Sequence, residues 1–365
     1  MSKITMFNAN DSGSFQQHFI RLLSRAWNEL TGIAATDTEI VLTLEGSDDV
    51  LTITGSGFIV DGDGRLFGGT VTGVRMVDGG KPYFGIRDIA IAVSDFAAVF
   101  DDGNKQDIAD LFGPMTIFGS LGGDSDSGDD ILFGSSGDDV MHAKSGSDVL
   151  TGNDGADLLD GGDNLDAAGY MYGGGVTASL FDPSRNTGDA QGDRYRDIEG
   201  LLGSEFKDDL QGDQRRNVIA GIGGNDIISG LGGHDLLGGG KGADILIGGA
   251  SADMLFGEGG RDIFVYTALA DSGVDRRGRD EIADFNGQGM DRIDLRKLDA
   301  VAGGSDDGFA FIGGEEFTAL GQVRVSLKGG DTLIELNIAG NKAADMAILL
   351  KDIRPAEIGE ADFIL

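Results

Sequence analysis

The sequence predicts a mainly β protein, most of which is built from short repeated coils. A glycine, an aspartate and one large apolar residue return every nine positions, as they do between Gly239 and Tyr266. This period fits neither an amphipathic helix nor an alternating strand, so it describes a larger repeating unit. Residues 1–115 lack the period and predict a small α+β domain ahead of the repeats. A low-complexity coil would also be rich in glycine, but here the apolar residues keep a fixed phase.

Composition restricts the partners of the chain. It has 62 acidic and 28 basic residues, a formal net charge of -34. We therefore expect it to repel nucleic acid and anionic membranes and to attract cations. Cysteine is absent, which excludes disulfides and thiolate metal sites. No apolar run is long enough to span a membrane as a helix, and the first residues lack an apolar signal-peptide segment.

Residues 1–115 are predicted to form one long helix, several strands and two short helices. Apolar residues from Phe15 to Leu30 recur at helical spacing. The other predicted elements are the strands 38–44 and 49–60 and the short helices 94–100 and 104–112. Residues 61–64, DGDG, resemble the start of a calcium loop. Arg65 stands where such a loop needs an oxygen ligand, which favours a plain turn.

Two blocks of nine-residue units follow, 116–166 and 203–265, with an interruption at 167–202. The sixth position of a unit carries an acid or an amide, and the eighth carries a large apolar residue. The sixth positions are Asp130, Asp139, Asp148, Asp157 and Asp166, then Asp208, Asn217, Asp226, Asp235, Asp244, Asp253 and Asp262. The eighth positions are Leu132, Met141, Leu150 and Leu159, then Leu210, Ile219, Ile228, Leu237, Leu246, Leu255 and Phe264. So long a run in constant phase is not a chance pattern.

The unit matches G-G-x-G-x-D-x-U-x, where U is a large aliphatic residue, and resembles the calcium-binding nonapeptide repeat of RTX proteins. The resemblance implies a right-handed parallel β-roll, in which two units complete one coil and Ca²⁺ lies between successive turns. The sixth-position residues would then be metal ligands, for roughly seven ions in all. Weak or empty sites are expected where the pattern fails, at Phe206, Arg215, Asn217 and the pair Ala143 and Lys144.

The residue types suit this chemistry. Glycines let the backbone turn its carbonyls inward, and the aspartate adds a carboxylate, so each loop offers the hard oxygens that Ca²⁺ prefers. Burying one aliphatic side chain per unit contributes less free energy than the ordering of nine residues costs. We therefore expect the chain to fold only when calcium binds, because binding free energy is folding free energy here.

The remaining segments also resemble parts of RTX proteins. The interruption resembles the insert between repeat blocks, a hairpin-like excursion that returns through Gly192, Asp193, Tyr195, Ile198 and Glu199. Its tyrosines favour packing against the roll over a carbohydrate platform. Residues 266–365 resemble the module that closes the roll in serralysin-type proteases. The resemblance implies a type I secretion signal at the end of the chain, carried by Asp362, Phe363, Ile364 and Leu365. A buried terminal strand is compatible with that role.

Catalytic motifs of related exoproteins are missing. The three histidines, His18, His142 and His234, are far apart in the sequence, and neither H-E-x-x-H nor G-x-S-x-G occurs. We therefore expect a secreted, extracellular, non-catalytic calcium-binding protein that acts at a cell surface, on a matrix polysaccharide or on a host. The competing hypothesis is an enzyme whose active site lies in residues 1–115, with the repeats as its folding and secretion module.

Overall fold

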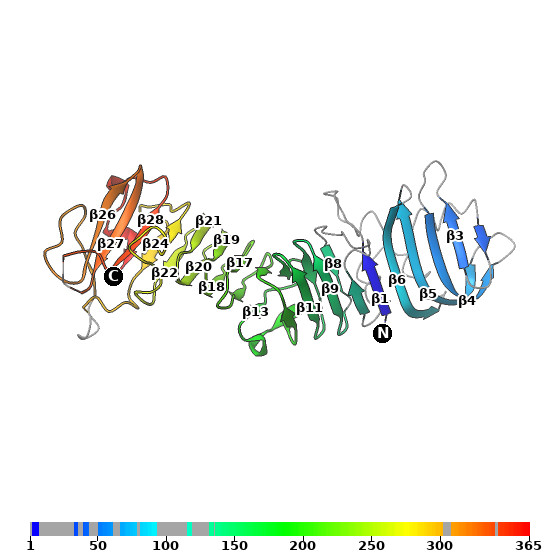
Figure 1. The fold of residues 1–365 in the computed structure, drawn as a ribbon. Coiled ribbons are helices and arrows are strands. Elements are labelled where there is room, and N and C mark those ends of the chain that lie inside the picture. The colour runs from blue at the N-terminus through cyan, green and yellow to red at the C-terminus, as the bar shows by residue number, and fades with distance from the viewer. Residues whose placement is uncertain are drawn as a thin grey trace. The chain divides into compact units, whose positions relative to one another are not determined.

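A computed structural model describes two compact units of the chain. It describes residues 131–134, 136–301, 308–339 and 342–365 in full, and seven strands between Ser2 and Phe118 by their backbone alone. One unit is Met1–Ala168 with Ala190–Ile198, and the other is Gly169–Asp189 with Glu199–Leu365 (Figure 1). The finer division at 115, 166, 202 and 265 stays a prediction.

The first unit begins with a mostly antiparallel sheet. Its strands are β1 (Ser2–Met6), β2 (Ile33–Ala35), β3 (Glu39–Thr43), β4 (Val50–Val60), β5 (Leu66–Asp78), β6 (Lys81–Ala92) and β7 (Met115–Phe118), in the spatial order β7-β1-β6-β5-β4-β3-β2. The strands predicted at 38–44 and 49–60 are confirmed as β3 and β4, which pair antiparallel. The predicted helices and the 61–64 turn lie outside the described residues.

The first repeat block adds parallel strands to this unit. β9 (Val140–Ser145), β11 (Leu158–Asp163) and β14 (Arg194–Arg196) extend the sheet beyond β7, and β8 (Ile131–Phe133), β10 (Val149–Thr151) and β12 (Ala167–Gly169) form a second layer. The pairing joins residues 18 apart, such as Met141 with Leu159 and Leu132 with Leu150. These four eighth-position side chains have no exposed surface, so they form the thin core of the block.

The second unit repeats this arrangement over a longer stretch. One sheet has the order β13 (Thr177–Ser179), β16 (Asp209–Gln211), β18 (Ile227–Gly232), β20 (Ile245–Ala250), β22 (Ile263–Val265), β24 (Arg292–Asp294) and β29 (Phe363–Ile364). The facing sheet runs through β15 (Gly200–Leu202), β17 (Val218–Ala220), β19 (Leu236–Gly242), β21 (Met254–Gly260), β23 (Glu281–Ile282) and β28 (Met346–Leu350). Successive units alternate between the two sheets, and their eighth-position side chains are 0–1% exposed. The parallel β-roll predicted from the repeats is confirmed.

The segment 167–202 is not a simple excursion from the roll. Besides the 3-10 turns Pro183–Arg185 and Gly188–Ala190, it supplies strands that pair with repeat strands: β14 with β11 in the first unit, and β13 with β16 in the second. Thr177 and Thr187 form its one antiparallel bridge in the described residues. Tyr170 is buried, which agrees with the packing prediction, whereas Tyr172 is 69% exposed.

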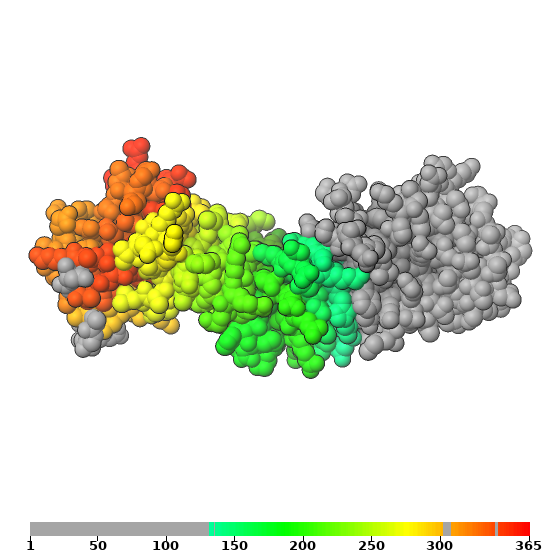
Figure 2. Space-filling model, viewed as in Figure 1, coloured from blue at the N-terminus to red at the C-terminus, as the bar shows by residue number. Residues whose placement is uncertain are grey.

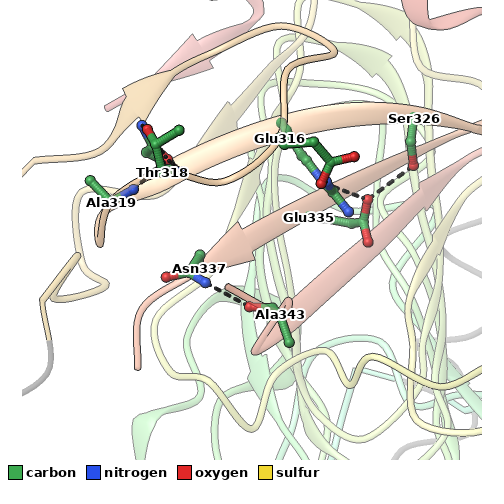
Figure 3. Close-up of polar contacts among 9 residues, drawn as sticks. Glu316, Thr318, Ala319, Ser326, Glu335, Asn337 and Ala343 are labelled. Carbon is green, nitrogen blue, oxygen red and sulfur yellow. Dashed lines mark hydrogen bonds and ion pairs between the residues drawn. The ribbon is translucent and has the colours of Figure 1, made fainter. Parts of the chain in front are cut away.

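A cap closes the second unit. β26 (Gln322–Lys328) and β27 (Asp331–Asn337) form an antiparallel meander with β28, and the short β25 (Ala310–Phe311) pairs with β26. Arg324 on β26 contacts Glu335 and Glu316, each at 3.0 Å, and Ser326 donates to the same Glu335 (Figure 3). The 3-10 turns Pro355–Glu357 and Glu360–Asp362 lead to β29. The cap, orange and red, continues the roll at its yellow end (Figure 2).

The chain closes on the roll itself, because β29 pairs in parallel with β24. Phe363 in this strand is 6% exposed, so the terminal strand expected from the sequence is present and partly buried. No helix in the described part of the chain is long and apolar enough to cross a membrane.

Candidate metal centres in the roll

The predicted ligand positions that the structure describes lie in equivalent turns of the roll. Asp130 lies outside the described residues. The other eleven side chains, Asp139 through Asp166 in the first block and Asp208 through Asp262 in the second, are 0–3% exposed. Each comes at the end of a turn and just before a strand, because the apolar residue two positions later points into the core. So many buried carboxylates need compensation, since burying a charge without a partner is costly.

In most of these acids one carboxylate oxygen accepts a hydrogen bond from a backbone N–H of the previous coil. The backbone N–H of Asp226 donates to Oδ1 of Asp244, and that of Asp244 donates to Oδ1 of Asp262, at 2.8 and 2.9 Å. The other face of the roll repeats the contact from Asn217 to Asp235 and from Asp235 to Asp253, at 2.7 and 2.8 Å. The first block has it from Asp139 to Asp157 at 2.7 Å. The acids therefore form two hydrogen-bonded ladders with an 18-residue step.

The second carboxylate oxygen, Oδ2, does not accept such a hydrogen bond in several of these acids. Among the described residues, Oδ2 has no hydrogen-bond partner in a set of buried acids: Asp157, Asp226, Asp235, Asp244, Asp253 and Asp262. A native structure rarely leaves a buried oxygen in this state, so each case needs a partner that the protein itself does not supply. A cation fits that requirement, because the oxygen is charged and cannot donate.

The first glycine of each unit leaves the space for that cation. A Cβ built on Gly239 would lie 2.5 Å from Oδ2 of Asp244 and 2.9 Å from the carbonyl oxygen of Gly257. A Cβ on Gly221 would likewise meet Oδ2 of Asp226 and the carbonyl oxygen of Gly239. A carboxylate oxygen and a carbonyl oxygen from the next coil thus converge on the same small space. These are the hard oxygen ligands that Ca²⁺ takes.

The second position has a left-handed backbone in most units of the roll. Gly240 has a φ of 98°, and Ile222 and Leu231, which replace the glycine, keep φ values of 76° and 72°. Ser204 and Asp213, at the second positions of the first two units of the second block, do not have a positive φ. A side chain is strained in the left-handed conformation, more so when it is β-branched. The preference for glycine at this position therefore follows from the turn itself.

Electrostatics within the ladders favour a bound cation. Burial raises the pKa of Asp157 to about 8, and raises the pKa values of Asp226, Asp253 and Asp262 to about 7. Hydrogen bonds from backbone amides lower these pKa values, and neighbouring acids on the ladder raise them further. The roll without metal would therefore hold several protons near neutral pH. A cation that neutralises the carboxylates removes the cause of these shifts.

Two turns at the start of the second block differ. Oδ2 of Asp208 accepts the N–H of Ser204 at 2.6 Å, and the Ser204 hydroxyl lies 3.1 Å from both carboxylate oxygens. Asn217 accepts the N–H of Asp213 at 2.8 Å and donates its amide N–H to the carbonyl of Glu199 at 3.1 Å. Protein groups satisfy both side chains. The turns with Phe206 and Asn217, where weak sites were expected, are thus held without a metal.

Three ladder members were missed by the sequence analysis because they lie outside the two glycine-rich repeat blocks. Asp193 accepts the N–H of Asp157 at 3.0 Å, Asp280 that of Asp253 at 2.9 Å, and Asp291 that of Asp262 at 3.0 Å. Each is followed two positions later by a large residue that pairs in register with an eighth position, namely the half-buried Tyr195 or the buried Ile282 and Ile293. The triplet D-x-U, without its glycines, was the signal that could have found them.

A cluster of basic residues lies in the loop at 275–280. Arg276 and Arg277 are exposed. Arg279 and Asp280 are 7% and 0% exposed, and Asp280 occupies a ladder position.

The loop after β27 is held by protein groups. Asp345 accepts the N–H groups of Ile338 and Ala339, both at 2.7 Å, and the Asn337 side chain donates to the carbonyl of Ala343 at 2.8 Å (Figure 3). Lys342 lies in this loop with a φ of 61°. Backbone donors therefore occupy Oδ2 of Asp345.

Comparison with protein families agrees with the site geometry. The model of the RTX calcium-binding nonapeptide repeat matches residues 116–150, 124–159 and 133–166. The model of the peptidase M10 serralysin C-terminal domain matches residues 204–365. The chain contains RTX calcium-binding nonapeptide repeats and a serralysin-type C-terminal domain. RTX nonapeptide repeats bind calcium.

Solved structures with some likeness to this RTX chain are themselves repeat modules. The AlgE6R3 subunit of the mannuronan C5-epimerase of Azotobacter vinelandii is 27% identical, with 45% of this chain and 80% of that one covered and a TM-score of 0.20. The AlgE6R2 subunit of the same enzyme is 23% identical, with 45% and 90% covered and a TM-score of 0.21. Superpositions this poor carry no argument. No curated protein matches the chain.

The RTX sites differ in kind from clustered side-chain sites. In the described residues, no three His, Cys, Asp or Glu side chains converge as a metal-binding group. The roll instead presents one carboxylate oxygen per turn close to a main-chain carbonyl oxygen of the next coil. The two described histidines lie outside it: His142 contacts Asp160 at 2.9 Å, and His234 contacts the carbonyl of Ala252 at 2.9 Å.

Proposed function

We propose that this protein is secreted, folds by binding several Ca²⁺ ions outside the cell, and acts there without catalysis at a surface, a matrix or a host. One observation carries the calcium-dependent part. The buried Oδ2 atoms of the ladder acids recur at an 18-residue step with no hydrogen-bond partner in the described residues. Calcium supplies the missing positive charge at each of them.

The number of ions follows from which acids are already satisfied. In the second block, Asp226, Asp235, Asp244, Asp253 and Asp262 keep a partnerless Oδ2. Asp208 and Asn217 do not, because Ser204 and Glu199 engage them. The second block then binds five ions. Asp157 in the first block shows the same signature. We infer that the first block supplies the remaining sites, for a total of about seven ions.

Calcium acts here as part of the fold. One oxygen of the acid accepts a hydrogen bond from the preceding coil, and the other faces the ion. Calcium binding in one turn therefore positions the acid of the next turn. The ions also neutralise part of the net charge of -34, which otherwise opposes compaction. Because extracellular calcium modules bind at about 10⁻⁴ to 10⁻³ M, the chain stays unfolded in a cytosol and folds outside.

Export by a type I exporter fits this switch. Asp362 and Phe363 of the C-terminal signal are 1% and 6% exposed in the folded chain. Asp362 accepts the N–H groups of Gly289 and Gly359, at 2.6 and 2.8 Å. An exporter reaches these side chains only before the roll folds. The serralysin-type domain supports the same route.

The competing function is enzymatic, with a site in residues 1–115 that matches no motif known to us. The roll would then serve as its folding and secretion module. Screening the full-length, calcium-loaded protein for glycan, ester and peptide hydrolysis separates the two hypotheses. Turnover that is abolished by point changes within 1–115 would replace the non-catalytic proposal, whereas specific binding to an extracellular polysaccharide without turnover would support it.

A calcium titration tests the proposed folding. Circular dichroism of the full chain in a chelator is expected to show little β signal, which rises cooperatively as Ca²⁺ is added. Magnesium at the same concentration serves as the control, because it demands a smaller, more regular cage. A compact and ordered protein in excess chelator would refute calcium-dependent folding. Export is tested separately, by comparing culture supernatants of strains with and without a type I exporter.

A further inference from the structure

An apolar patch covers the outer face of one sheet of the roll. In β18, β20 and β22, which lie side by side (Figure 1), the core position is buried and its two neighbours are half-buried on the outer face. Ile227, Ile245 and Ile263 precede the core positions and pair in register across the three strands. Ile247 and Val265 follow the core positions of β20 and β22. We call these aliphatic residues the outer aliphatic face.

Opposite charges lie at the two ends of the isoleucine row. In β16, Asp209 pairs in register with Ile227, and in β24, Arg292 pairs in register with Ile263. From β16 to β24 the row therefore consists of an acid, three isoleucines and a base. Neighbouring strands lie about 4.8 Å apart, so Asp209 and Arg292 are about 19 Å apart and do not pair within one copy.

The two end charges stay available to a partner. Arg185 lies 3.8 Å from Asp209, and these side chains are 48% and 41% exposed. An ion pair this long and this exposed contributes little. In the described part of the chain, Arg292 forms no ion pair. Each end of the row therefore offers a charge that a second molecule can neutralise.

The outer face of the other sheet has no such pair of ends. Its equivalent row runs in register from β15 to β23 through Gly200, Val218, Leu236, Met254 and Glu281. This row is also apolar in the middle, and Met254 is 41% exposed. It begins with a glycine and ends with an acid, so its two ends are not complementary. Of the two rows, only the one in the outer aliphatic face is complementary to its own reverse.

We propose that the outer aliphatic face packs against the same face of a second copy of this chain, in a dimer with twofold symmetry. A symmetric contact uses one patch on both copies, so that patch must be complementary to itself. A twofold axis parallel to the strands reverses the strand order of the second copy. Ile245 then lies opposite Ile245 of the other copy, and Asp209 lies opposite Arg292. The proposal goes beyond the calcium-dependent function and adds a partner to it.

A twofold axis perpendicular to the strands fits the charges less well. It would place Asp209 opposite Gln211 and Arg292 opposite Asp294, because these residues lie two positions apart in β16 and β24. Asp294 already accepts hydrogen bonds from its own Arg296 at 3.0 and 2.7 Å. This arrangement would leave Asp209 without a basic group from the other copy. The axis parallel to the strands is therefore the one proposed.

The size of the face predicts a weak dimer. At about 19 Å across, it buries less than the standard interface of about 800 Å² per partner. The net charge of -34 also opposes association, although bound calcium and salt reduce that repulsion. We expect a dissociation constant of roughly 10 to 100 µM for the calcium-loaded chain.

Sedimentation velocity of the full-length, calcium-loaded protein, at up to about 300 µM, tests the contact. The parent should sediment increasingly as a dimer as its concentration rises. Ile245→Asp would place two carboxylates opposite each other and should raise the dissociation constant about tenfold or more. Met254→Asp is the matched control, because it adds the same charge to the outer face of the other sheet, and it should dimerise like the parent. A parent that stays monomeric, or a dimer that Ile245→Asp leaves unchanged, overturns the proposal.

Charge reversal keeps the test valid if Ile245→Asp does not fold, because it leaves the aliphatic residues in place. Asp209→Arg and Arg292→Asp should each weaken the dimer about tenfold, since each places like charges opposite each other. The double variant restores both ion pairs and should dimerise nearly as well as the parent. Damage to the fold would not be repaired in this way. A double variant as weak as the single ones overturns the proposed arrangement.

Discussion

The backbone N–H of Asp226 donates a 2.8 Å hydrogen bond to Oδ1 of Asp244, eighteen residues later in the chain. The same carboxylate turns its Oδ2 toward Gly239 of its own unit and the carbonyl of Gly257. One oxygen of this side chain thus accepts a hydrogen bond from the previous coil, while the other faces the proposed metal position beside the next coil. A change at one turn therefore alters the position of the acids in neighbouring coils. We expect the roll to lose its ions cooperatively.

A methyl group at Gly239 is expected to block one calcium site. In Gly239→Ala the added Cβ would occupy the space between Asp244 and Gly257, 2.5 and 2.9 Å from their oxygens. The variant should bind at least one ion fewer and need several-fold more Ca²⁺ to fold. Gly238→Ala is the matched control, because its Cβ would meet only the flexible end of Glu258 at 3.3 Å. Equal calcium midpoints for the two variants, by circular dichroism titration, would contradict the assignment.

An acid at position 217 is expected to create a site. In Asn217→Asp one oxygen would keep the Asp213 N–H, while the other would face the carbonyl of Glu199 in place of the amide that now donates to it. Two facing oxygens repel unless a cation lies between them. The variant should therefore be less stable than the parent in chelator and should bind one more ion in excess calcium. Isothermal titration calorimetry gives the count, and an unchanged number would show that the turn cannot accept calcium.

Most of the roll could be predicted from the sequence because each recurring residue type, glycine, aspartate or a large apolar residue, has one structural role in the unit. Leu246 and Leu255 had to be core, and Asp244 and Asp253 had to be turn acids, since no other element repeats in nines. Asp280 and Asp291 were missed because the glycine pattern of the units does not continue into the segments that precede them. Their role depends on strand pairing that only the folded chain shows.

The state of individual sites could not be predicted from residue identity alone. Asp208 and Asp226 are both sixth-position aspartates, yet only Asp226 has a partnerless Oδ2. The difference is Ser204, whose N–H and hydroxyl reach Asp208. Sequence analysis attributed weakness of that turn to Phe206, at the position normally held by glycine. The contacts show instead that an internal donor takes the oxygen a metal would use.

Relief of backbone strain at Ile222 is expected to stabilise the second block. Its φ of 76° is a left-handed conformation that costs a β-branched residue roughly 1–2 kcal/mol. Ile222→Gly should therefore raise the free energy of unfolding by about 1 kcal/mol in saturating calcium, as measured by urea denaturation. Ile227→Gly, in the strand β18 where φ is not positive, should lower it. A loss of stability in Ile222→Gly would mean that side-chain packing outweighs the strain.

Acid is expected to stabilise the calcium-free fold and to weaken calcium binding. Burial raises the folded-state pKa of Asp226, Asp253 and Asp262 to about 7, above the ordinary value of 3.8 that the unfolded chain keeps. Between these two values the folded form holds protons that the unfolded form has released. Stability of the calcium-free protein must therefore be highest at low pH and fall as pH rises toward 7.

Calcium reverses this dependence, because it binds the ionised carboxylates and competes with the protons. Its apparent affinity should rise from pH 5 to pH 8 and level off once Asp157, with a pKa of about 8, has ionised. Urea unfolding in chelator and calcium titrations at pH 5, 6, 7 and 8 give the two curves. Asp294 serves as an internal contrast, because its hydrogen bonds to Arg296 lower its pKa. Asp294→Asn should leave the pH dependence of calcium affinity unchanged, whereas an affinity independent of pH in the unmodified chain would show that the ladder acids are not the ligands.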